Sequence, residues 1–406
     1  MSPSEARQHV LDVMRAALAA VNGRQCVREA LAAEPIQGPV YVLAFGKAAC
    51  PMARGASDAL GERVVDAFVA TKHGHAETLP WPVLEAAHPV PDESSLAAGE
   101  ELLRFVERIP QSAHVLVLLS GGASALVEKL PPGATLETLQ RLNEWLLASG
   151  RDIAAMNRIR KRLSLIKGGR LAERLAPRPV TCLAISDVPD DDPRFIGSGP
   201  LVADASVAEE PFDDAPPEVR AALLAAPPVP PPGDPCFARV RFRIVARLGD
   251  AKRAAARAAA ARGWQAVVHD ELLAGEATDA GVTLARELLA SAPDTLHVWG
   301  GETTVRLPAS PGRGGRNQSL ALAAARELTG ARGVLLLAVG TDGTDGPTAD
   351  AGALVDGGTI ERGEQAGLEA DSALARADAG TFLEASGDLV RTGPTGTNVM
   401  DLVLGL

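Results

Sequence analysis

The chain has 406 residues, of which 46% are apolar, 22% are charged and 3% are aromatic. This length predicts about two to three domains, and the composition predicts globular cores built mainly from Val, Leu, Ile and Ala. The formal net charge of −11 argues against a general nucleic-acid binder, because that function needs a positive surface.

The cysteines and the apolar runs indicate where the protein works. Cys26, Cys50, Cys182 and Cys236 are scattered, without a CxxC motif or a neighbouring histidine, which predicts reduced thiols rather than a disulfide framework or a zinc site. The N-terminal EARQHVLDVMRAALAAV predicts an amphipathic helix and lacks the apolar core of a signal peptide. The longest apolar runs are too short to cross a bilayer. We expect a soluble, cytoplasmic protein.

Strand-like and helical stretches alternate in the first half of the chain. The expected strands are residues 40–45, 64–70, 114–119 and 180–185, and the expected helices lie near 48–60, 94–108, 135–149 and 157–174. Alternation of this kind is typical of βα units and a mainly parallel sheet. Residues 204–238 hold clustered prolines and acids, and they predict a linker or surface excursion because proline runs cannot join a sheet interior.

The alternation then restarts and predicts a second domain. Strands are expected at 240–246, 264–270, 296–301 and 334–340, and helices at 250–262 and 276–291. The economical interpretation is an N-terminal α/β domain over residues 1–220 and a C-terminal α/β domain over residues 239–406. This division leaves open whether the end of the chain packs back on the N-terminal domain.

Two turns in the first half follow expected strands. Gly46 and Lys47 stand where residues 40–45 meet a helix, so the lysine can reach a phosphate at the helix start; the alternative is a solvated lysine beside a turn glycine. Gly121, Gly122 and Ser124 follow residues 114–119 and form either an anion cradle or a plain tight turn. Neither turn carries a GxGxxG or Walker A motif.

Charged segments follow these turns. Residues 156–172 concentrate Arg158, Arg160, Lys161, Arg162, Lys167 and Arg170 behind Asn157. They form either a solvated helix face or a positive wall for ATP or an acidic substrate. Asp187 comes directly after an expected strand, and such a carboxylate can hold Mg²⁺ or accept a proton from a hydroxyl. The alternative for Asp187 is an acidic surface turn.

Three glycine-rich loops mark the C-terminal third, at residues 312–318, 340–346 and 392–398. Gly314, Gly315, Arg316 and Asn317 open a helical stretch, where backbone amides and an arginine favour an anion. Asp342, Asp345 and Asn398 add polar groups in the other two loops, while Glu302 stands in a turn where a structural role is equally open. These loops predict a site for a phosphorylated ligand and a metal. The histidines show no metal-ligand or catalytic-triad spacing.

The ordered series of motifs resembles the glycerate 2-kinase family, whose members are also labelled hydroxypyruvate reductases. The matching strings are FGKAACPMA, TKHGH, AAHPVPDESS, LLSGGASAL, MNRIRKRLSLIKGGRLA, SDVPDDDPRFIGSGP, GGETTV, GRGGRNQ, GTDGTDGPT and GDLVRTGPTGTNVMDL. The resemblance implies a Rossmann-like three-layer N-terminal domain with a mainly parallel sheet, a smaller C-terminal α/β domain with a mixed sheet, and an active site in the cleft between them. The implied reaction is ATP-dependent phosphorylation of D-glycerate on the 2-hydroxyl.

The resemblance also implies residue roles. Lys47, Arg316, Asp187 and Asp342 would be catalytic, and Asp187 or Asp342 would hold Mg²⁺ bound to ATP. The remaining implied contacts to substrate or nucleotide are Gly46, Gly121, Gly122, Ser124, Asn157, Arg160, Lys161, Ser198, Gly199, Glu302, Gly314, Gly315, Asn317 and Asn398. The expected partners are small molecules, without nucleic acid or membrane, and a homodimer is an option.

This chain departs from the family pattern at several positions. Asp190 replaces a glycine, Met400 replaces an asparagine, Ala349 and Asp350 stand where the family tends to have Asp-Ala, and residues 377–380 lack the usual Asn-Asp-Ser-Tyr. These departures keep two alternatives open, an NAD(P)H-dependent hydroxypyruvate reductase and a non-catalytic relative that binds a nucleotide or small acid. Against the reductase, no GxGxxG follows any expected strand.

Overall fold

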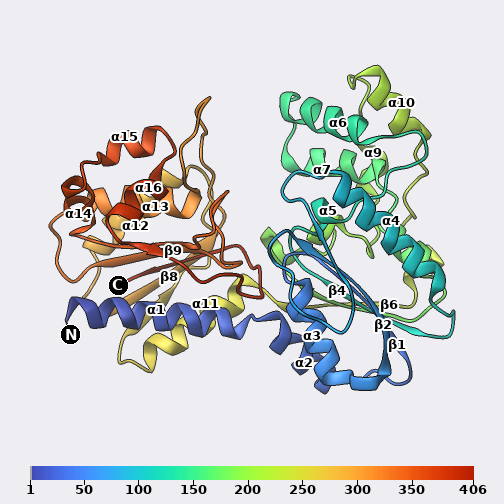
Figure 1. Ribbon diagram of the computed structural model, residues 1–406, viewed down its shortest axis with the longest axis horizontal. Helices are drawn as coiled ribbons and strands as arrows, with labels where there is room; N and C mark the ends of the chain where they lie inside the picture. The colour runs from blue at the N-terminus through green and yellow to red at the C-terminus, as the bar shows by residue number, and fades with distance from the viewer. Residues whose placement is uncertain (1) are drawn as a thin grey trace. The chain divides into compact units, whose positions relative to one another are not determined.

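The computed structural model describes residues 2–406, and the chain forms two compact units (Figure 1). One unit comprises residues 23–245, and we call it the contiguous unit. The other combines the N-terminal segment up to Asn22 with residues 246–406, and we call it the split unit. Each unit is an α/β structure, as the sequence predicted, and each is built on a six-stranded sheet.

The sheet of the contiguous unit has the strand order β3-β2-β1-β4-β5-β6. The pairs β1–β2, β1–β4, β2–β3 and β4–β5 are parallel. Runs such as VYVLAF and HVLVLL are apolar along their length because parallel strands are buried on both faces. The strands are β1 (Val40–Phe45), β2 (Val64–Lys72), β3 (Val83–Ala86), β4 (His114–Leu119), β5 (Val180–Ile185) and β6 (Val240–Ala246).

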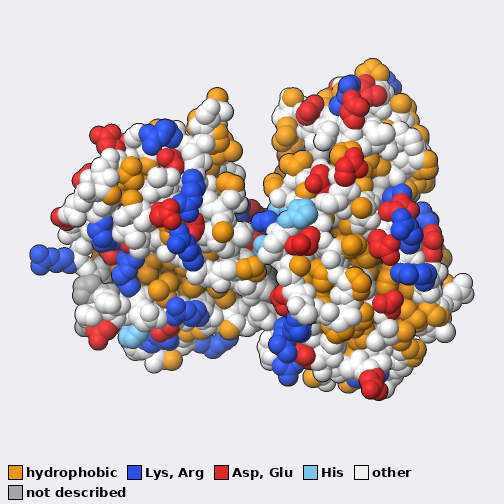
Figure 2. Space-filling model, viewed as in Figure 1, with side chains coloured by type: hydrophobic (Ala, Val, Ile, Leu, Met, Phe, Trp, Pro, Cys, Tyr) orange, Lys and Arg blue, Asp and Glu red, His pale blue; other side chains and the backbone are white. Residues whose placement is uncertain are grey.

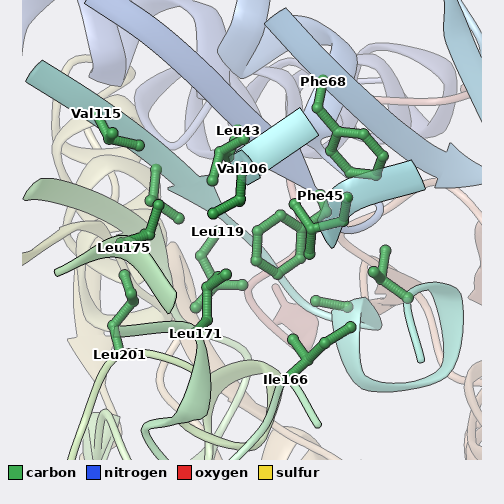
Figure 3. Close-up of a cluster of buried hydrophobic side chains, with 14 of the residues drawn as sticks. Leu43, Phe45, Phe68, Val106, Val115, Leu119, Ile166, Leu171, Leu175 and Leu201 are labelled. Carbon is green, nitrogen blue, oxygen red and sulfur yellow. The ribbon is translucent and has the colours of Figure 1, made fainter. Parts of the chain in front are cut away.

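Helices cover both faces of this sheet and form an outlying cluster. Phe45, Leu119 and Leu171 belong to the core beneath the sheet (Figure 3). A separate apolar cluster joins α6, α7 and α10, with Leu142, Ile159 and Val219 fully buried in it. The α-helices are α2 (Gly23–Ala33), α3 (Ala49–Leu60), α4 (Glu93–Arg108), α5 (Ala123–Leu126), α6 (Leu136–Ala148), α7 (Ile153–Leu163), α8 (Arg170–Leu175), α9 (Ser206–Glu209) and α10 (Pro217–Ala225); the 3₁₀ turns are η1 (Gly61–Arg63), η2 (Pro189–Asp191), η3 (Ile196–Ser198) and η4 (Pro235–Phe237).

The split unit has a mixed sheet of order β11-β10-β9-β12-β8-β7. β12 is central and pairs antiparallel with both β8 and β9, whereas β7 and β8 are parallel. The strands are β7 (Gln265–Val268), β8 (Thr295–Gly301), β9 (Leu335–Gly340), β10 (Gly352–Asp356), β11 (Leu389–Val390) and β12 (Asp401–Gly405).

The helices of the split unit come from both ends of the sequence. α1, drawn in dark blue in Figure 1, packs against α11, while α13 packs against β9 and β10. Ser2 and Glu5 form a capping box at the start of α1, which satisfies amides that have no partner within the helix. The helices are α1 (Pro3–Ala20), α11 (Leu248–Ala260), α12 (Ala277–Leu289), α13 (Arg316–Glu327), α14 (Thr359–Gln365), α15 (Ala370–Ala375) and α16 (Ala379–Ala385).

The structure corrects the expected domain limits of 1–220 and 239–406. Residues up to Asn22 belong with the C-terminal part of the chain, because α1 packs on α11. Residues 239–245 belong to the contiguous unit, because β6 extends its sheet beside β5. The proline-rich residues 204–238 also lie in the contiguous unit, where they contain α9, α10 and η4. The end of the chain is a central strand of the split unit's sheet.

Two other features complete the comparison with the sequence. The helix expected at 157–174 is interrupted between α7 and α8, because Gly168 and Gly169 take positive φ values of 60° and 86°. All four cysteines are free and buried. Within residues 2–406, none of the helices combines the length and apolarity that a bilayer crossing requires.

Candidate functional site

The carboxyl ends of β1 and β4 bring two predicted turns together. In this sheet, β1 lies between β2 and β4, so the strand order reverses between β1 and β4. In open α/β sheets, ligands bind at such a switch point. Lys47 follows β1, and its backbone amide donates to the carbonyl oxygen of Gly121, which follows β4, at 2.9 Å. The structure therefore places Gly46, Lys47 and the Gly121–Gly122 turn at one edge of the sheet.

Glycine is required at two positions of this edge. Gly46 has a φ of 126°, and a Cβ there would lie 2.5 Å from the carbonyl oxygen of Ser120. Gly122 has a φ of 79°, and a Cβ there would lie 3.0 Å from a ring carbon of His88 and 3.2 Å from Cγ of Lys47. L-residues rarely adopt such φ values. The Lys47 side chain and the His88 ring thus both pass close to the backbone of Gly122.

A cavity of about 370 Å³ opens beside this turn. Its volume lies within the range of small-molecule sites. Six predicted residues line it, namely Gly122, Ser124, Asn157, Arg160, Asp187 and Ser198, and sequence reasoning did not single out His88, Asn143, Phe195 and Gly197, which line it too. Asp187 comes two residues after the end of β5, so the carboxyl ends of three adjacent parallel strands supply polar groups to this region.

Hydrogen bonds within the protein position several cavity side chains. The Ser124 and Ser198 hydroxyls lie 2.9 Å apart. Nε of Arg160 donates to Asn143 at 2.9 Å, and its Nη1 donates to Asn157 at 3.2 Å. Burial lowers the pKa of the Arg160 guanidinium below its usual value. Gly199 is engaged through its backbone, since its carbonyl oxygen accepts from the amide of Gly169 at 2.8 Å.

Lys161, one of the predicted ligand contacts, forms a buried ion pair. Its side chain is fully buried, and Nζ donates to Oδ2 of Asp204 at 2.6 Å. The ammonium also lies 5.1 Å from the centre of the Phe195 ring. Burial lowers the pKa of Lys161, although Asp204 opposes this effect. An ammonium with a buried carboxylate partner forms a structural ion pair, and a contact of Lys161 with a ligand stays a prediction.

A second buried ion pair lies at the cavity wall. Nζ of Lys167 donates to Oε2 of Glu128, and the Ser164 hydroxyl donates to Oε1 of Glu128 at 2.6 Å. Glu128 and Lys167 both line the cavity, yet their side chains are 2% and 6% exposed. The basic segment 156–172 thus divides between groups that face the cavity and groups that neutralise buried carboxylates.

The predicted residues of the split unit gather at the start of α13. Nε and Nη2 of Arg316 donate to both carboxylate oxygens of Asp401, at 2.6 and 3.0 Å. Nη1 of Arg316 lies 2.6 Å from Oε1 of Glu302. Burial opposes the charge of Arg316, but Asp401 and Glu302 outweigh it and raise its pKa. Asp401 and Glu302 thus both contact Arg316, where the sequence favoured an anion.

The start of α13 also has its own carboxylate. Asp345 accepts from the backbone amide of Asn317 at 3.0 Å and from that of Gln318 at 2.8 Å. A Cβ on Gly315 would lie 2.5 Å from the backbone of Asp345, and the backbone of Gly314 passes close to that of Gly380. Burial raises the pKa of Asp345 to about 7. The amides that were expected to bind a ligand anion are satisfied by Asp345.

Asp342 and Asn398 lie in neighbouring loops of the split unit. Oδ1 of Asp342 accepts from the amide and the hydroxyl of Thr344, both at 2.9 Å, and the backbone carbonyl of Asp342 accepts from the amide of Thr395. Asp342 and Asn398 are both 6% exposed. The structure thus brings the loops at 340–346 and 392–398 together, next to β9 and β12.

Three of the departures from the family pattern fall at unusual backbone angles. Asp190, Ala377 and Met400 have positive φ values of 61°, 53° and 69°. Glycine and asparagine adopt this region most readily, so the residues that the resemblance leads us to expect there would fit these backbone angles. Asp350, another departure, is buried and pairs with Arg313 and Arg391 at 2.6 and 2.7 Å.

Comparisons with known proteins agree with this architecture. A family model described as a domain of unknown function, DUF4147, matches residues 9–215, and the MOFRL family model matches residues 295–401. A D-glycerate 2-kinase of Thermotoga maritima is 36% identical over 421 residues, covering 100% of this chain and 99% of the relative. A crystal structure of a glycerate kinase from Thermotoga maritima superimposes with a TM-score of 0.86 at 35% identity, covering 100% of both chains.

These matches define a two-domain α/β phosphotransferase. An Agrobacterium vitis relative, 38% identical over 98% of this chain and 93% of its own length, carries the name hydroxypyruvate reductase with a qualifier that marks an unproven assignment. The matches extend across both units and over nearly the whole length of the relatives. The chain belongs to the glycerate 2-kinase family.

Proposed function

We propose that this protein transfers the γ-phosphoryl group of ATP to the 2-hydroxyl of D-glycerate and yields 2-phosphoglycerate. The carrying observation is the cluster at the switch point of the contiguous unit, where Lys47 and the Gly121–Gly122 turn adjoin a polar cavity. The full-length likeness to a D-glycerate 2-kinase supports the same reaction.

Phosphoryl transfer depends on positioning and on neutralising the charge of the phosphoryl oxygens. Lys47 provides a compact positive charge beside glycine backbone that a phosphate can approach closely. The Ser124 and Ser198 hydroxyls and the Arg160 guanidinium line the adjoining cavity, where they can bind further phosphate oxygens. We assign the nucleotide phosphates to this group of residues.

Arg316 is the group that best fits the glycerate carboxylate. A guanidinium binds a carboxylate through two parallel hydrogen bonds, and Arg316 already makes this arrangement with Asp401. Glu302 is half-exposed, with its side chain 51% accessible, and it meets Arg316 through Nη1. Glycerate can exchange with Glu302 at this nitrogen while Asp401 continues to orient the guanidinium. We therefore assign Arg316 to substrate and Asp401 to the positioning of Arg316.

The oxygen donors at the cavity fit Mg²⁺. The Asp187 carboxylate and the Ser124 and Ser198 hydroxyls line it together, and hard cations of this kind take oxygen ligands, usually one or two carboxylates together with substrate phosphates. When bound, Mg²⁺ would neutralise part of the phosphate charge. Asp187 is our choice for the metal-linked carboxylate, and Asp342, held by Thr344, is our choice for orienting the substrate hydroxyl.

A kinase assay with product analysis tests the proposed reaction. Purified protein with Mg·ATP and D-glycerate should release ADP, and NMR of the product should place the phosphate on carbon 2. Protein with NADH or NADPH and hydroxypyruvate should leave the nicotinamide absorbance unchanged. Failure to release ADP while the ligands still raise the melting temperature would instead identify a non-catalytic binder.

Two substitutions test the residue roles. We expect Lys47→Ala and Arg316→Ala each to lower kcat/KM by about 10²–10³-fold, because each removes a positive group aimed at substrate charge. Matched controls are Lys129→Ala and Arg306→Ala, which remove surface ion pairs with Glu100 and Glu276. Steady-state kinetics would contradict the roles if either site variant kept a near-normal rate.

A further inference from the structure

Three potential metal ligands meet at one side of the split unit's sheet. His269 directly follows β7, His297 is the third residue of β8, and Glu287 lies near the end of α12. Nε2 of His269 is 3.0 Å from Nδ1 of His297. Oε1 of Glu287 is 3.5 Å from the first nitrogen and 3.6 Å from the second. The three atoms therefore form a nearly regular triangle.

The size of this triangle suits a tetrahedral metal ion. Ligands at about 2.0–2.1 Å from a tetrahedral Zn²⁺ lie about 3.3–3.4 Å from one another. The observed separations of 3.0, 3.5 and 3.6 Å bracket that value. A point that is equidistant from the three atoms, slightly out of their plane, lies about 2 Å from each, which is the usual Zn–N and Zn–O distance. Metal binding therefore requires only small shifts of the side chains.

Neighbouring residues hold the two imidazoles in this arrangement. The Ser291 hydroxyl lies 2.6 Å from Nε2 of His297, and if it accepts the proton of that nitrogen, Nδ1 is left free to bind a metal. Metal-bound histidines commonly have such a partner on the second ring nitrogen. The Trp299 indole stacks against both imidazoles, with ring centroids 4.7 and 5.2 Å away, and Trp299 itself is buried.

We propose that His269, Glu287 and His297 bind Zn²⁺ or a similar late divalent transition metal. Two imidazole nitrogens and one carboxylate oxygen favour such ions over Mg²⁺, which prefers oxygen ligands. The side chains of His269 and Glu287 are 24% and 40% exposed, so water can supply the fourth ligand. The ion would link α12 to β7 and β8 and stabilise the split unit.

This site is separate from the groups assigned to phosphoryl transfer. Four residues lie between His297 and Glu302, which pairs with Arg316. An extended strand rises about 3.3 Å per residue, so His297 lies about 13 Å from Gly301 at the end of β8, and Glu302 follows beyond that end. Zinc binding can therefore be measured without glycerate or nucleotide.

Calorimetry and thermal unfolding test the proposal on the full chain. Protein freed of metal with a chelator should bind one equivalent of Zn²⁺, and Zn²⁺ should raise its melting temperature, whereas Mg²⁺ at the same concentration should not. The Ser291→Ala variant should bind Zn²⁺ about 10–100-fold more weakly, the usual effect of losing a partner of a ligating histidine. H269Q and E287Q remove a ligand itself, so each should weaken binding by at least that factor.

The exposed His73 provides the matched control, because H73Q removes a histidine from the contiguous unit and should leave Zn²⁺ binding unchanged. Circular dichroism without metal should show that H269Q and E287Q are folded. The proposal is overturned if Zn²⁺ neither binds nor raises the melting temperature of the unmodified chain, leaving an imidazole–imidazole hydrogen bond in place of a metal site. It is also overturned if H269Q and E287Q bind Zn²⁺ as well as the unmodified chain does.

Discussion

Both the backbone conformation and the neighbouring site residues restrict which side chain can stand at Gly122. Its φ of 79° places it in the left-handed region, and His88 and Lys47 leave little room for a side chain. Gly133 has a similar φ of 87°, but a Cβ there would have no atom within 4 Å. Comparing substitutions at these two glycines therefore distinguishes the effect of backbone strain from the effect of crowding Lys47 and His88.

We expect Gly122→Ala and Gly133→Ala each to lower the free energy of unfolding by about 1–2 kcal/mol, because both force a Cβ into the left-handed region. Only Gly122→Ala should also lower kcat/KM, since its methyl group displaces the Lys47 side chain. Urea unfolding and steady-state kinetics on both variants measure the two effects. Equal activity in the two variants would show that Lys47 does not depend on this turn.

The sequence could predict that residues at the ends of different strands lie close together. Gly122, Ser124 and Asp187 all line the cavity because the ends of parallel strands share one edge of the sheet. It could not predict the partners of Arg316 and Lys161, since Asp401 is 85 residues from Arg316 and Asp204 is 43 from Lys161. Composition and local sequence pattern contain no information about ion pairs between residues so far apart in the sequence.

At the scale of elements, the Lys161–Asp204 ion pair connects α7 to the segment before α9. Removing one partner of a buried pair leaves an uncompensated charge, whereas replacing both with apolar residues is often neutral. We expect Lys161→Ala to lower the free energy of unfolding by about 3–5 kcal/mol. The double variant Lys161→Met/Asp204→Leu should recover most of this loss in urea unfolding.

The same double variant also tests whether Lys161 contacts a ligand. If its role is structural, the double variant should keep most of the kinase activity. A loss of activity comparable with that of Lys47→Ala, in a double variant of normal stability, would return Lys161 to the group of ligand-binding residues.

The start of α13 should make the stability of the protein depend on pH. Burial raises the pKa of Asp345 to about 7, compared with about 3.9 in an unfolded chain. The folded state then binds this proton more tightly, so the contribution of Asp345 to stability is complete below about pH 4 and is lost as the pH rises through about 7. A difference of about three pK units corresponds to about 4 kcal/mol.

Asp345→Asn removes this titration. We expect the stability of the unmodified chain relative to the variant to fall steadily as the pH rises from about 4 to 8. Asp213→Asn, at an aspartate whose side chain is 87% exposed, should give a curve parallel to that of the unmodified chain. Urea unfolding across this pH range measures both differences. A constant difference between the Asp345→Asn variant and the unmodified chain would contradict the raised pKa.

The elements themselves were largely predictable. Four strands of the contiguous unit, β1, β2, β4 and β5, are mainly apolar runs bounded by turns, and they begin where the sequence predicted. β10 and β12 have only five residues each and follow glycine-rich loops, and a pattern of that length does not distinguish a strand from a loop. The break between α7 and α8 was missed because basic residues continue on both sides of Gly168 and Gly169.

At the scale of the whole molecule, charge is dispersed. Acidic and basic side chains are interspersed on both units on the face shown in Figure 2, consistent with the many surface ion pairs. The assignment of α1 was the main error at this scale. Its amphipathic pattern predicted a helix but contained no information about which sheet the helix covers, and it joins the split unit through α11.

The two units should unfold as separable transitions, and core substitutions should identify them. Val13 in α1 and Leu322 in α13 belong to the split unit, Leu142 in α6 belongs to the contiguous unit, and all three are fully buried. We expect Val13→Ala and Leu322→Ala to lower the midpoint of one transition and Leu142→Ala that of the other, since each creates a cavity that costs about 2 kcal/mol or more.

Differential scanning calorimetry measures these shifts. A Val13→Ala variant that lowers the same midpoint as Leu142→Ala would show that α1 belongs energetically to the contiguous unit. A single transition lowered equally by all three substitutions would show that the units unfold together, contrary to the prediction.

The composition of the split unit has a consequence for biosynthesis. α1 is translated before residues 23–245, but β12, which lies between β8 and β9 and carries the partner of Arg316, is translated after them. Domains generally fold as units while the ribosome proceeds, so residues 23–245 can fold on the nascent chain while α1 still lacks its packing surface. The second sheet can therefore close only after β12 has been synthesised, and α1 needs protection from aggregation until then.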